Sequence, residues 1–242
     1  MKYLLLLASL TSTIFLADLH AQSGPTPFPT TDADWPGKGP SKYFPYMDDN
    51  RKGFWDRRAQ DQGAIVLAGD SLTAGPHWED LQKAFPDQII ANRGIGGDTS
   101  RGLLFRFQED VLDLHPKAIM ILIGDNDLSA HGKPDDTIFN IGQMVDMAQK
   151  QDPSVPIILC TTPPRNNPKA PTLPGKQEEL NDKIKGLASE KIKVIDLYPL
   201  YCISNGQQDP QYFQADLLHL APAAYVKFQD ALQKELQTLS LK

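Results

Sequence analysis

Short apolar runs alternate along the chain with longer segments whose apolar residues follow a helical spacing. Five runs predict strands, at residues 64–69, 88–92, 118–123, 156–160 and 193–197. The run at 118–123 is apolar throughout, which is typical of a parallel strand covered on both faces. Helices are expected at residues 73–85, 100–114, 135–150, 176–190 and 222–236. This alternation predicts an α/β fold with a doubly wound parallel sheet of about five strands.

The N-terminal segment predicts a secretory signal peptide over residues 1–21. Lys2 precedes an apolar run at residues 3–16, and Ala21 is a small residue at the expected cleavage point. The apolar run is too short for a comfortable membrane span. We therefore expect a secreted or periplasmic protein, cleaved after Ala21, with no membrane span in the mature chain.

Two further segments precede the first predicted strand. Residues 22–42 contain five prolines, which predicts a flexible, extended leader. The next segment carries Phe44, Tyr46, Phe54 and Trp55, and these aromatic residues predict a helix that is pinned against the fold. We expect residues 43–242 to form a single domain.

The amino-acid composition limits the classes of function that this chain can have. The chain has 242 residues, of which 40% are hydrophobic, so it can bury a sizeable core. The net charge of −6 argues against a nucleic-acid partner, which would require a basic face. Cys160 and Cys202 could form a disulfide in an oxidising compartment, or stay as two separate thiols. Their spacing matches no metal site, and we expect no metal ion or cofactor.

Polar or glycine-rich clusters follow three of the predicted strands, and a fourth precedes the last helix. They lie at residues 69–71, 94–99, 124–127 and 216–219. In open α/β sheets, chemistry gathers beyond the carboxyl ends of the strands. Ser71 stands where a nucleophile would be presented, although a serine there could also simply cap the following helix.

The four clusters contain the groups that ester hydrolysis requires. These are a nucleophile, a base that takes its proton, an acid that orients the base, and donors to the developing oxyanion. Ser71, His219 and Asp216 could fill the first three roles. Gly97 and Asn126 could supply donors. Asp216 and His219 are three residues apart and could touch directly on a turn.

This ordered set of motifs resembles the GDSL/SGNH hydrolase family, a family of serine esterases, lipases and acetylesterases. The matching blocks are Gly69-Asp70-Ser71-Leu72, Gly97 within Gly-Gly-Asp-Thr, Asn126 within Gly-Asp-Asn-Asp, and Asp216-x-x-His219. Together they cover essentially the whole predicted domain. The resemblance implies a three-layer α/β/α sandwich with a flavodoxin-like sheet.

The resemblance also implies roles for individual residues. Ser71 would be the nucleophile and His219 the base, oriented by Asp216. The oxyanion hole would consist of the N–H groups of Ser71 and Gly97 and the side-chain amide of Asn126. The chain departs from the family at one position, because Leu217 stands where many members have glycine.

Simpler interpretations of these residues remain open from the sequence. Asn126 could be a turn or capping residue, and His219 could be a core histidine satisfied by Asp216. We expect Asp70 to take no part in proton transfer and to hold its loop through backbone N–H groups.

The function implied by the resemblance is hydrolysis of a carboxylic ester through an acyl-enzyme. Export favours a small-molecule or saccharide substrate with a short acyl group, such as an acetylated saccharide. A lysophospholipase or thioesterase of the same family is an alternative. Another is a carbohydrate-binding protein that keeps the fold without turnover, although it would be expected to lack one of Ser71, His219 and Asp216.

Overall fold

The computed structural model describes residues 23–75, 78–239 and 241. It contains a sheet of five parallel strands in the order β2-β1-β3-β4-β5. The strands are β1 (Ile65–Gly69), β2 (Ile90–Gly94), β3 (Ala118–Leu122), β4 (Ile157–Cys160) and β5 (Ile192–Ile195). The predicted doubly wound sheet is confirmed, and its strand order is that of flavodoxin-like folds. The predicted signal peptide lies outside the described residues.

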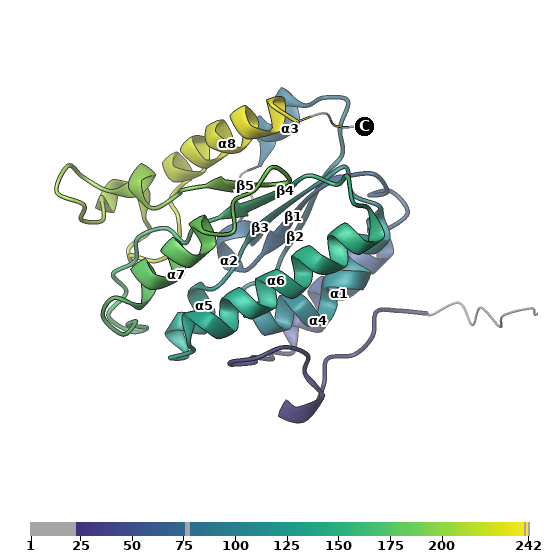
Figure 1. The fold of residues 1–242 in the computed structure, drawn as a ribbon, viewed down its shortest axis with the longest axis horizontal. Helices are drawn as coiled ribbons and strands as arrows, with labels where there is room; N and C mark the ends of the chain where they lie inside the picture. Colours follow the sequence, from purple (N-terminus) through teal and green to yellow (C-terminus); the bar gives the residue numbers. More distant parts are fainter. Residues whose placement is uncertain (1–22, 76–77, 240, 242) are drawn as a thin grey trace, which may run out of the picture.

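Helices cover both faces of this sheet. Their bounds are α1 (Tyr46–Arg57), α2 (Ser71–Ala74), α3 (Glu79–Ala84), α4 (Ser100–Asp110), α5 (Asp125–Ser129), α6 (Pro134–Gln151), α7 (Lys176–Lys185) and α8 (Pro222–Gln237). Short 3₁₀ turns lie at η1 (Asp32–Asp34), η2 (Leu112–Leu114), η3 (Pro199–Tyr201) and η4 (Pro210–Tyr212). In Figure 1, α8 and α3 lie on one side of the sheet and α6, α4 and α1 on the other. The fold is a three-layer α/β/α sandwich.

The central strands are apolar throughout because each contributes residues to two separate cores. Val66 and Ile119 pack toward α4, α6 and α7. Their neighbours Leu67 and Met120 pack toward α3 and α8 on the opposite face. Successive side chains of a strand point to opposite faces, so a strand buried on both faces needs apolar residues at every position.

The strand order brings the site motifs to one edge of the sheet. β1 lies between β2 and β3. The connection that follows β1 (α2 and α3) lies on one face of the sheet, whereas those that follow β2 and β3 (α4 and α6) lie on the other. Parallel strands end at the same edge, so the segments after β1, β2 and β3 lie together there. Gly69 ends β1, and a side chain at this position would lie 2.2 Å from the carbonyl oxygen of Leu122. Glycine therefore permits the close approach of β1 and β3 at the site.

The leader differs from the flexible segment that the prolines predicted. Phe28 and Trp35 are each only 7% exposed, and their rings stack 5.5 Å apart. Arg101 of α4 forms an ion pair with Asp32 at 2.6 Å and donates to the carbonyl oxygens of Asp32, Trp35, Pro36 and Gly39. The leader is extended, as proline-rich segments are, but it is docked on α4 through the buried Arg101 and through hydrogen bonds from Thr26 to Glu109.

Helix α1 forms near its predicted position, but only part of the predicted aromatic set attaches it to the fold. Phe54 packs against the buried cluster that contains Met47. The buried residues of α1 are Met47 and Arg51. Phe44 and Tyr46 are 41% and 46% exposed, so they do not pin the helix. Arg51 forms ion pairs with Glu109 and Asp110 at the end of α4, and these charges hold the helix in place.

Two remaining expectations concern the cysteines and the membrane. Both thiols are free, with Cys160 buried and Cys202 partly buried. The Cys202 Sγ lies 3.2 Å from the carbonyl oxygen of Tyr198. Among the described residues, no helix combines the length and the apolar character that crossing a bilayer requires.

Candidate active site

Ser71 is presented at the sharp turn from β1 into α2. It occupies the first position of α2, and Asp70 precedes it as the N-cap. The Asp70 carboxylate accepts a hydrogen bond of 2.9 Å from the backbone N–H of Leu72, which is the loop-holding contact expected from the sequence. The first N–H groups of a helix have no partner within the helix. The N–H of Ser71 is therefore placed to donate to a ligand at this turn.

The structure brings Ser71, His219 and Asp216 into one hydrogen-bonded chain. His219 Nε2 lies 3.1 Å from Ser71 Oγ, and His219 Nδ1 lies 2.5 Å from Asp216 Oδ2. Ser71 and His219 are 148 residues apart in sequence. The order nucleophile, imidazole and carboxylate is the geometry of a serine hydrolase triad.

The charge of Asp216 is stabilised where it faces His219. Partial burial by itself would raise its pKa, but hydrogen bonds from the His219 side chain and from the backbone N–H groups of His219 and Leu218 outweigh this effect and lower it. Asp216 is therefore an anion at neutral pH and can stabilise a protonated imidazole. The side chains of His219 and Asp216 are 38% and 39% exposed, so this side of the site is open to solvent.

Leu217 stands where many family members have glycine, and its backbone adopts a conformation that suits glycine. Its φ angle is 55°, in the left-handed region that glycine adopts freely and a branched residue does not. The Leu217 carbonyl oxygen accepts hydrogen bonds from Asn166 N at 3.0 Å and Gln208 Nε2 at 2.9 Å. Gln208 also donates to the carbonyl oxygen of Pro164. Gln208 and the segment that carries Pro164 and Asn166 thus hold the turn that carries Asp216 and His219.

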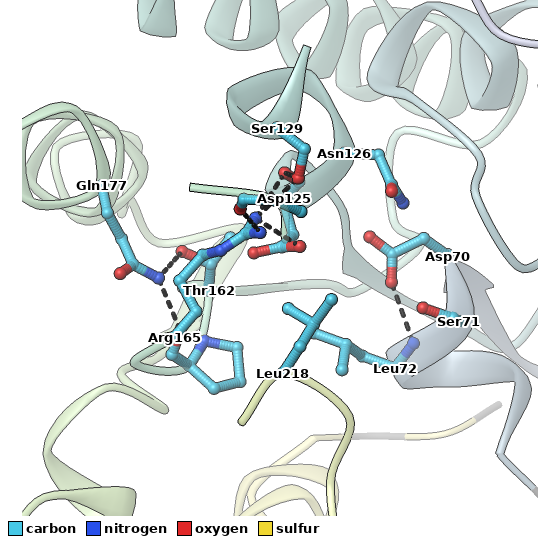
Figure 2. Close-up of polar contacts among 12 residues, drawn as sticks. Asp70, Ser71, Leu72, Asp125, Asn126, Ser129, Thr162, Arg165, Gln177 and Leu218 are labelled. Atoms are coloured by element: carbon cyan, nitrogen blue, oxygen red, sulfur yellow. Dashed lines mark hydrogen bonds and ion pairs between the residues drawn. The ribbon is translucent and has the colours of Figure 1, made fainter. Parts of the chain in front are cut away.

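Asn126 lies next to the loop that contains Gly97. Asn126 is in the first turn of α5, after β3, and its Nδ2 donates to the carbonyl oxygen of Asp98 at 3.0 Å. This bond joins α5 to the residue that follows Gly97. An asparagine amide has two N–H donors, so one bond to Asp98 leaves a second donor. In Figure 2 the Asn126 side chain points toward the segment that carries Asp70 and Ser71.

Arg106 of α4 connects the end of β1 to the loop that contains Gly97. Its Nε forms an ion pair with Asp98 at 2.8 Å, and its Nη2 donates to the carbonyl oxygen of Gly69 at 3.1 Å. Arg106 is fully buried. One guanidinium therefore sets the distance between the end of β1 and the loop that contains Gly97.

Arg165 holds α5 from the opposite side, as Figure 2 shows. Its Nη1 lies 2.7 Å from an Asp125 carboxylate oxygen and donates to the Ser129 hydroxyl at 2.8 Å. The Arg165 side chain is 2% exposed. Burial raises the pKa of Asp125, and the charge of Arg165 opposes this rise. The pair fixes the helix on which Asn126 stands.

Asp70 is unusual because only part of its carboxyl group is satisfied. Its Oδ2 is buried and has no hydrogen-bond partner among the described residues. Burial raises the pKa of Asp70 well above its ordinary range, and the nearby Asp125 raises it further. The contact with Leu72 is the observation that supports the expected loop-holding role of Asp70.

Sequence reasoning did not identify Arg106, Arg165 or Gln208. Arg106 carried a signal, since it lies among the apolar positions of its helix, three residues after Leu103 and next to Phe107. A charged residue on an apolar helical face needs a buried partner. Arg165 and Gln208 lie in irregular segments, where no periodicity indicates which residues face inward.

A family model supports the likeness seen in the motifs. The model of the GDSL-like Lipase/Acylhydrolase family matches residues 67–227, which include the site residues Ser71, Gly97, Asn126, Asp216 and His219. The uncharacterized lipoprotein YqeF of Bacillus subtilis is 39% identical over 85 residues, which span 29% of this chain and 35% of that protein. The platelet-activating factor acetylhydrolase IB subunit alpha1 of Bos taurus is 24% identical over 230 residues, 92% of this chain and 91% of that protein.

A solved structure agrees with the family match. A structure from Bacteroides fragilis superposes with a TM-score of 0.69 at 28% sequence identity, covering 81% of this chain and 99% of that one. The chain belongs to the GDSL-like lipase/acylhydrolase family, and it is an ester hydrolase.

Proposed function

We propose that the protein is a serine esterase that removes short acyl groups, above all acetyl groups, from saccharides through an acyl-enzyme. The observation that carries the proposal is the continuous chain from Ser71 Oγ to His219 Nε2 and from His219 Nδ1 to Asp216. A nucleophile activated by an adjacent base, which is itself oriented by a third group, is the arrangement that acyl transfer needs.

In the first half of the reaction, Ser71 Oγ attacks the ester carbonyl while His219 Nε2 takes the hydroxyl proton. The negative charge of Asp216 stabilises the imidazolium that results. The tetrahedral intermediate then collapses, and His219 gives its proton to the leaving alcohol oxygen. Ser71 is left as an acyl ester.

In the second half, water attacks the acyl ester and gives its proton to His219. Collapse of this intermediate releases the carboxylic acid and returns the proton to Ser71 Oγ. Negative charge develops on the former carbonyl oxygen in both halves. The N–H groups of Ser71 and Gly97 and the Asn126 amide are the donors that we assign to it.

Two observations favour a small acyl group. The relative that matches over 92% of this chain is named as an acetylhydrolase. The side chains of His219 and Asp216 are more than a third exposed, whereas long acyl chains are bound in enclosed apolar pockets. An open site accommodates a bulky alcohol such as a saccharide and gives little apolar contact to a long chain. We also propose export, from the pattern of residues 1–21.

The test is hydrolysis of p-nitrophenyl acetate by the parent protein and by a Ser71→Ala variant. The parent should release p-nitrophenol and carry an acetyl adduct that mass spectrometry locates on Ser71. The variant should show kcat lower by on the order of 10⁶ and an unchanged melting temperature. A variant that retains a tenth of the parental activity would exclude Ser71 as the nucleophile.

The rival function is a carbohydrate-binding protein without turnover. Ser71, His219 and Asp216 are all present and within hydrogen-bonding distance, which a protein that had lost catalysis has no reason to maintain. A panel of acetate, butyrate and octanoate esters together with acetylated xylo-oligosaccharides would separate these functions and define the acyl preference. Saccharide binding without any hydrolysis would favour the rival.

A further inference from the structure

Two exposed aromatic side chains lie side by side next to the active site. The rings of Phe44 and Tyr46 are 5.5 Å apart and nearly parallel, with an angle of 5° between their planes. They are 41% and 46% exposed. Neither residue is needed to attach α1, because that helix is held by Met47 and Arg51. The exposure of this aromatic pair therefore calls for a reason other than packing.

The aromatic pair rests on the loop to which we assign an oxyanion donor. The Tyr46 hydroxyl donates to the carbonyl oxygen of Gly96 at 2.9 Å. Gly97 has a φ angle of 77°, and a Cβ there would lie 3.1 Å from both Phe44 Cε2 and Tyr46 Oη. The absence of a side chain at Gly97 thus allows both rings to approach its backbone.

The same loop links the aromatic pair to the nucleophile. A Cβ on Gly96 would lie 3.9 Å from Ser71 Cβ and 4.0 Å from Tyr46 Oη. Ser71 and Tyr46 therefore both lie close to the same glycine. A substrate whose carbonyl group is held at Ser71 and Gly97 would extend within reach of the rings.

We propose that Phe44 and Tyr46 form a subsite for the sugar ring of the ester substrate. This inference rests on the proposed function and adds to it the part of the substrate, the sugar ring, that the protein would recognise. The flat face of a pyranose presents C–H groups, and these pack on the electron-rich face of an aromatic ring through dispersion and weak C–H contacts. Aromatic side chains have few rotatable bonds, so they lose little entropy on binding.

A neighbouring tyrosine shows what a purely structural aromatic residue looks like in this segment. Tyr43 is 46% exposed, but its ring lies 5.7 Å from that of Phe28 and its hydroxyl donates to Asp48 at 2.6 Å. Tyr43 thus packs against the docked leader. Phe44 and Tyr46 precede residues 67–227, the segment matched by the family model, so the family likeness assigns them no role.

The test compares two acetate esters that differ only in the alcohol. Acetylated methyl xylopyranoside carries a sugar ring, whereas ethyl acetate does not. In a Phe44→Ala variant, kcat/KM for the ring ester relative to that for ethyl acetate should fall about five- to tenfold, mainly through KM. Phe44→Trp should keep the parental ratio because it keeps an aromatic face. Tyr43→Ala is the matched control and should also keep the parental ratio.

A binding measurement decides the proposal independently of turnover. In the Ser71→Ala background, calorimetry should show that acetylated methyl xylopyranoside binds more tightly than ethyl acetate, and that Phe44→Ala removes this difference. Equal losses on both esters, or binding of the ring ester that Phe44→Ala leaves unchanged, would overturn the subsite. If the parent hydrolyses neither ester, the proposed function fails, and the binding result still decides the subsite.

Discussion

At the scale of single residues, Asn126 combines a structural contact with a proposed catalytic one. One N–H of its amide donates to the Asp98 carbonyl oxygen at 3.0 Å. The structural contact alone would make Asn126 a turn residue. The second N–H is the one that we assign to the oxyanion. A substitution that removes both donors should therefore change two separate quantities, the free energy of unfolding and the free energy of the transition state.

We predict that Asn126→Ala lowers kcat by about 10²–10³ and shifts KM by less than about fivefold. The loss is expected in kcat because the donor acts on charge that develops only in the transition state. Loss of the Asp98 contact should lower the free energy of unfolding by about 1 kcal/mol. Steady-state kinetics and thermal unfolding measure both effects.

The matched control is Asn205→Ala, since Asn205 is an exposed asparagine whose side chain bonds to Gln207. It should keep the parental kcat. An Asn126→Ala variant with parental kcat would mean that Asn126 is structural, and that Ser71 and Gly97 alone form the oxyanion hole.

At the scale of elements, the turn with Asp216 and His219 depends on segments distant from it. Leu217 adopts a left-handed conformation that costs about 1–2 kcal/mol in a residue with a branched side chain. Gln208 and Asn166 bond to its carbonyl oxygen and stabilise this conformation. Contacts from Gln208 and Asn166 therefore hold the turn in this conformation. Many family members have a glycine at the position of Leu217, and glycine adopts this conformation without such support.

We predict that Gln208→Ala lowers kcat about tenfold, because the turn then relaxes and displaces His219 from Ser71. A second substitution, Leu217→Gly, should restore most of this activity, since glycine adopts the required φ without strain. The measurement is kcat for p-nitrophenyl acetate in the single and double variants, at a temperature where all are folded.

Gln211→Ala serves as the control for Gln208, because Gln211 is exposed and its side-chain amide donates to Asp209, only two residues away in sequence. Its kcat should equal that of the parent. If Leu217→Gly restores nothing in the Gln208→Ala background, backbone strain at Leu217 is not what Gln208 opposes.

At the scale of the whole molecule, the N-terminal leader is part of the folded domain. Arg101 of α4 binds the leader through one ion pair and several hydrogen bonds to carbonyl oxygens. The leader runs directly into Phe44 and Tyr46. A contact more than sixty residues away in sequence therefore supports the approach to the active site.

We predict that Arg101→Ala lowers the free energy of unfolding by about 2–3 kcal/mol, because hydrogen bonds to a charged group are lost in a largely buried setting. It should also expose residues 23–42 to proteolysis while the rest of the domain stays resistant. Thermal unfolding and limited proteolysis with mass spectrometry measure these changes. Arg58→Ala removes an exposed arginine whose side chain lies over the Trp55 ring, and it should leave both properties at parental values. A leader that stays protected without Arg101 would contradict this account.

Most of the fold could be predicted because its signals are local. The apolar runs at 64–69 and 118–123 indicated strands, and the structure places β1 and β3 within them. The motifs at Ser71, Asn126 and His219 were visible because their residue types are unusual next to strands and helices. The flexible leader and the pinning role of Phe44 were not borne out in the structure, since composition does not indicate which neighbour an irregular segment meets.

The sequence by itself determined the sheet, the order of the motifs and the groups available for chemistry. These depend on residue identity and on spacing over a few positions. Only the tertiary structure decided that Arg106 joins Gly69 to Asp98, that Gln208 holds Leu217, and that Phe44 lies open beside Gly97. Such contacts join segments that no local pattern relates, and they form only when the packed layers bring those segments together.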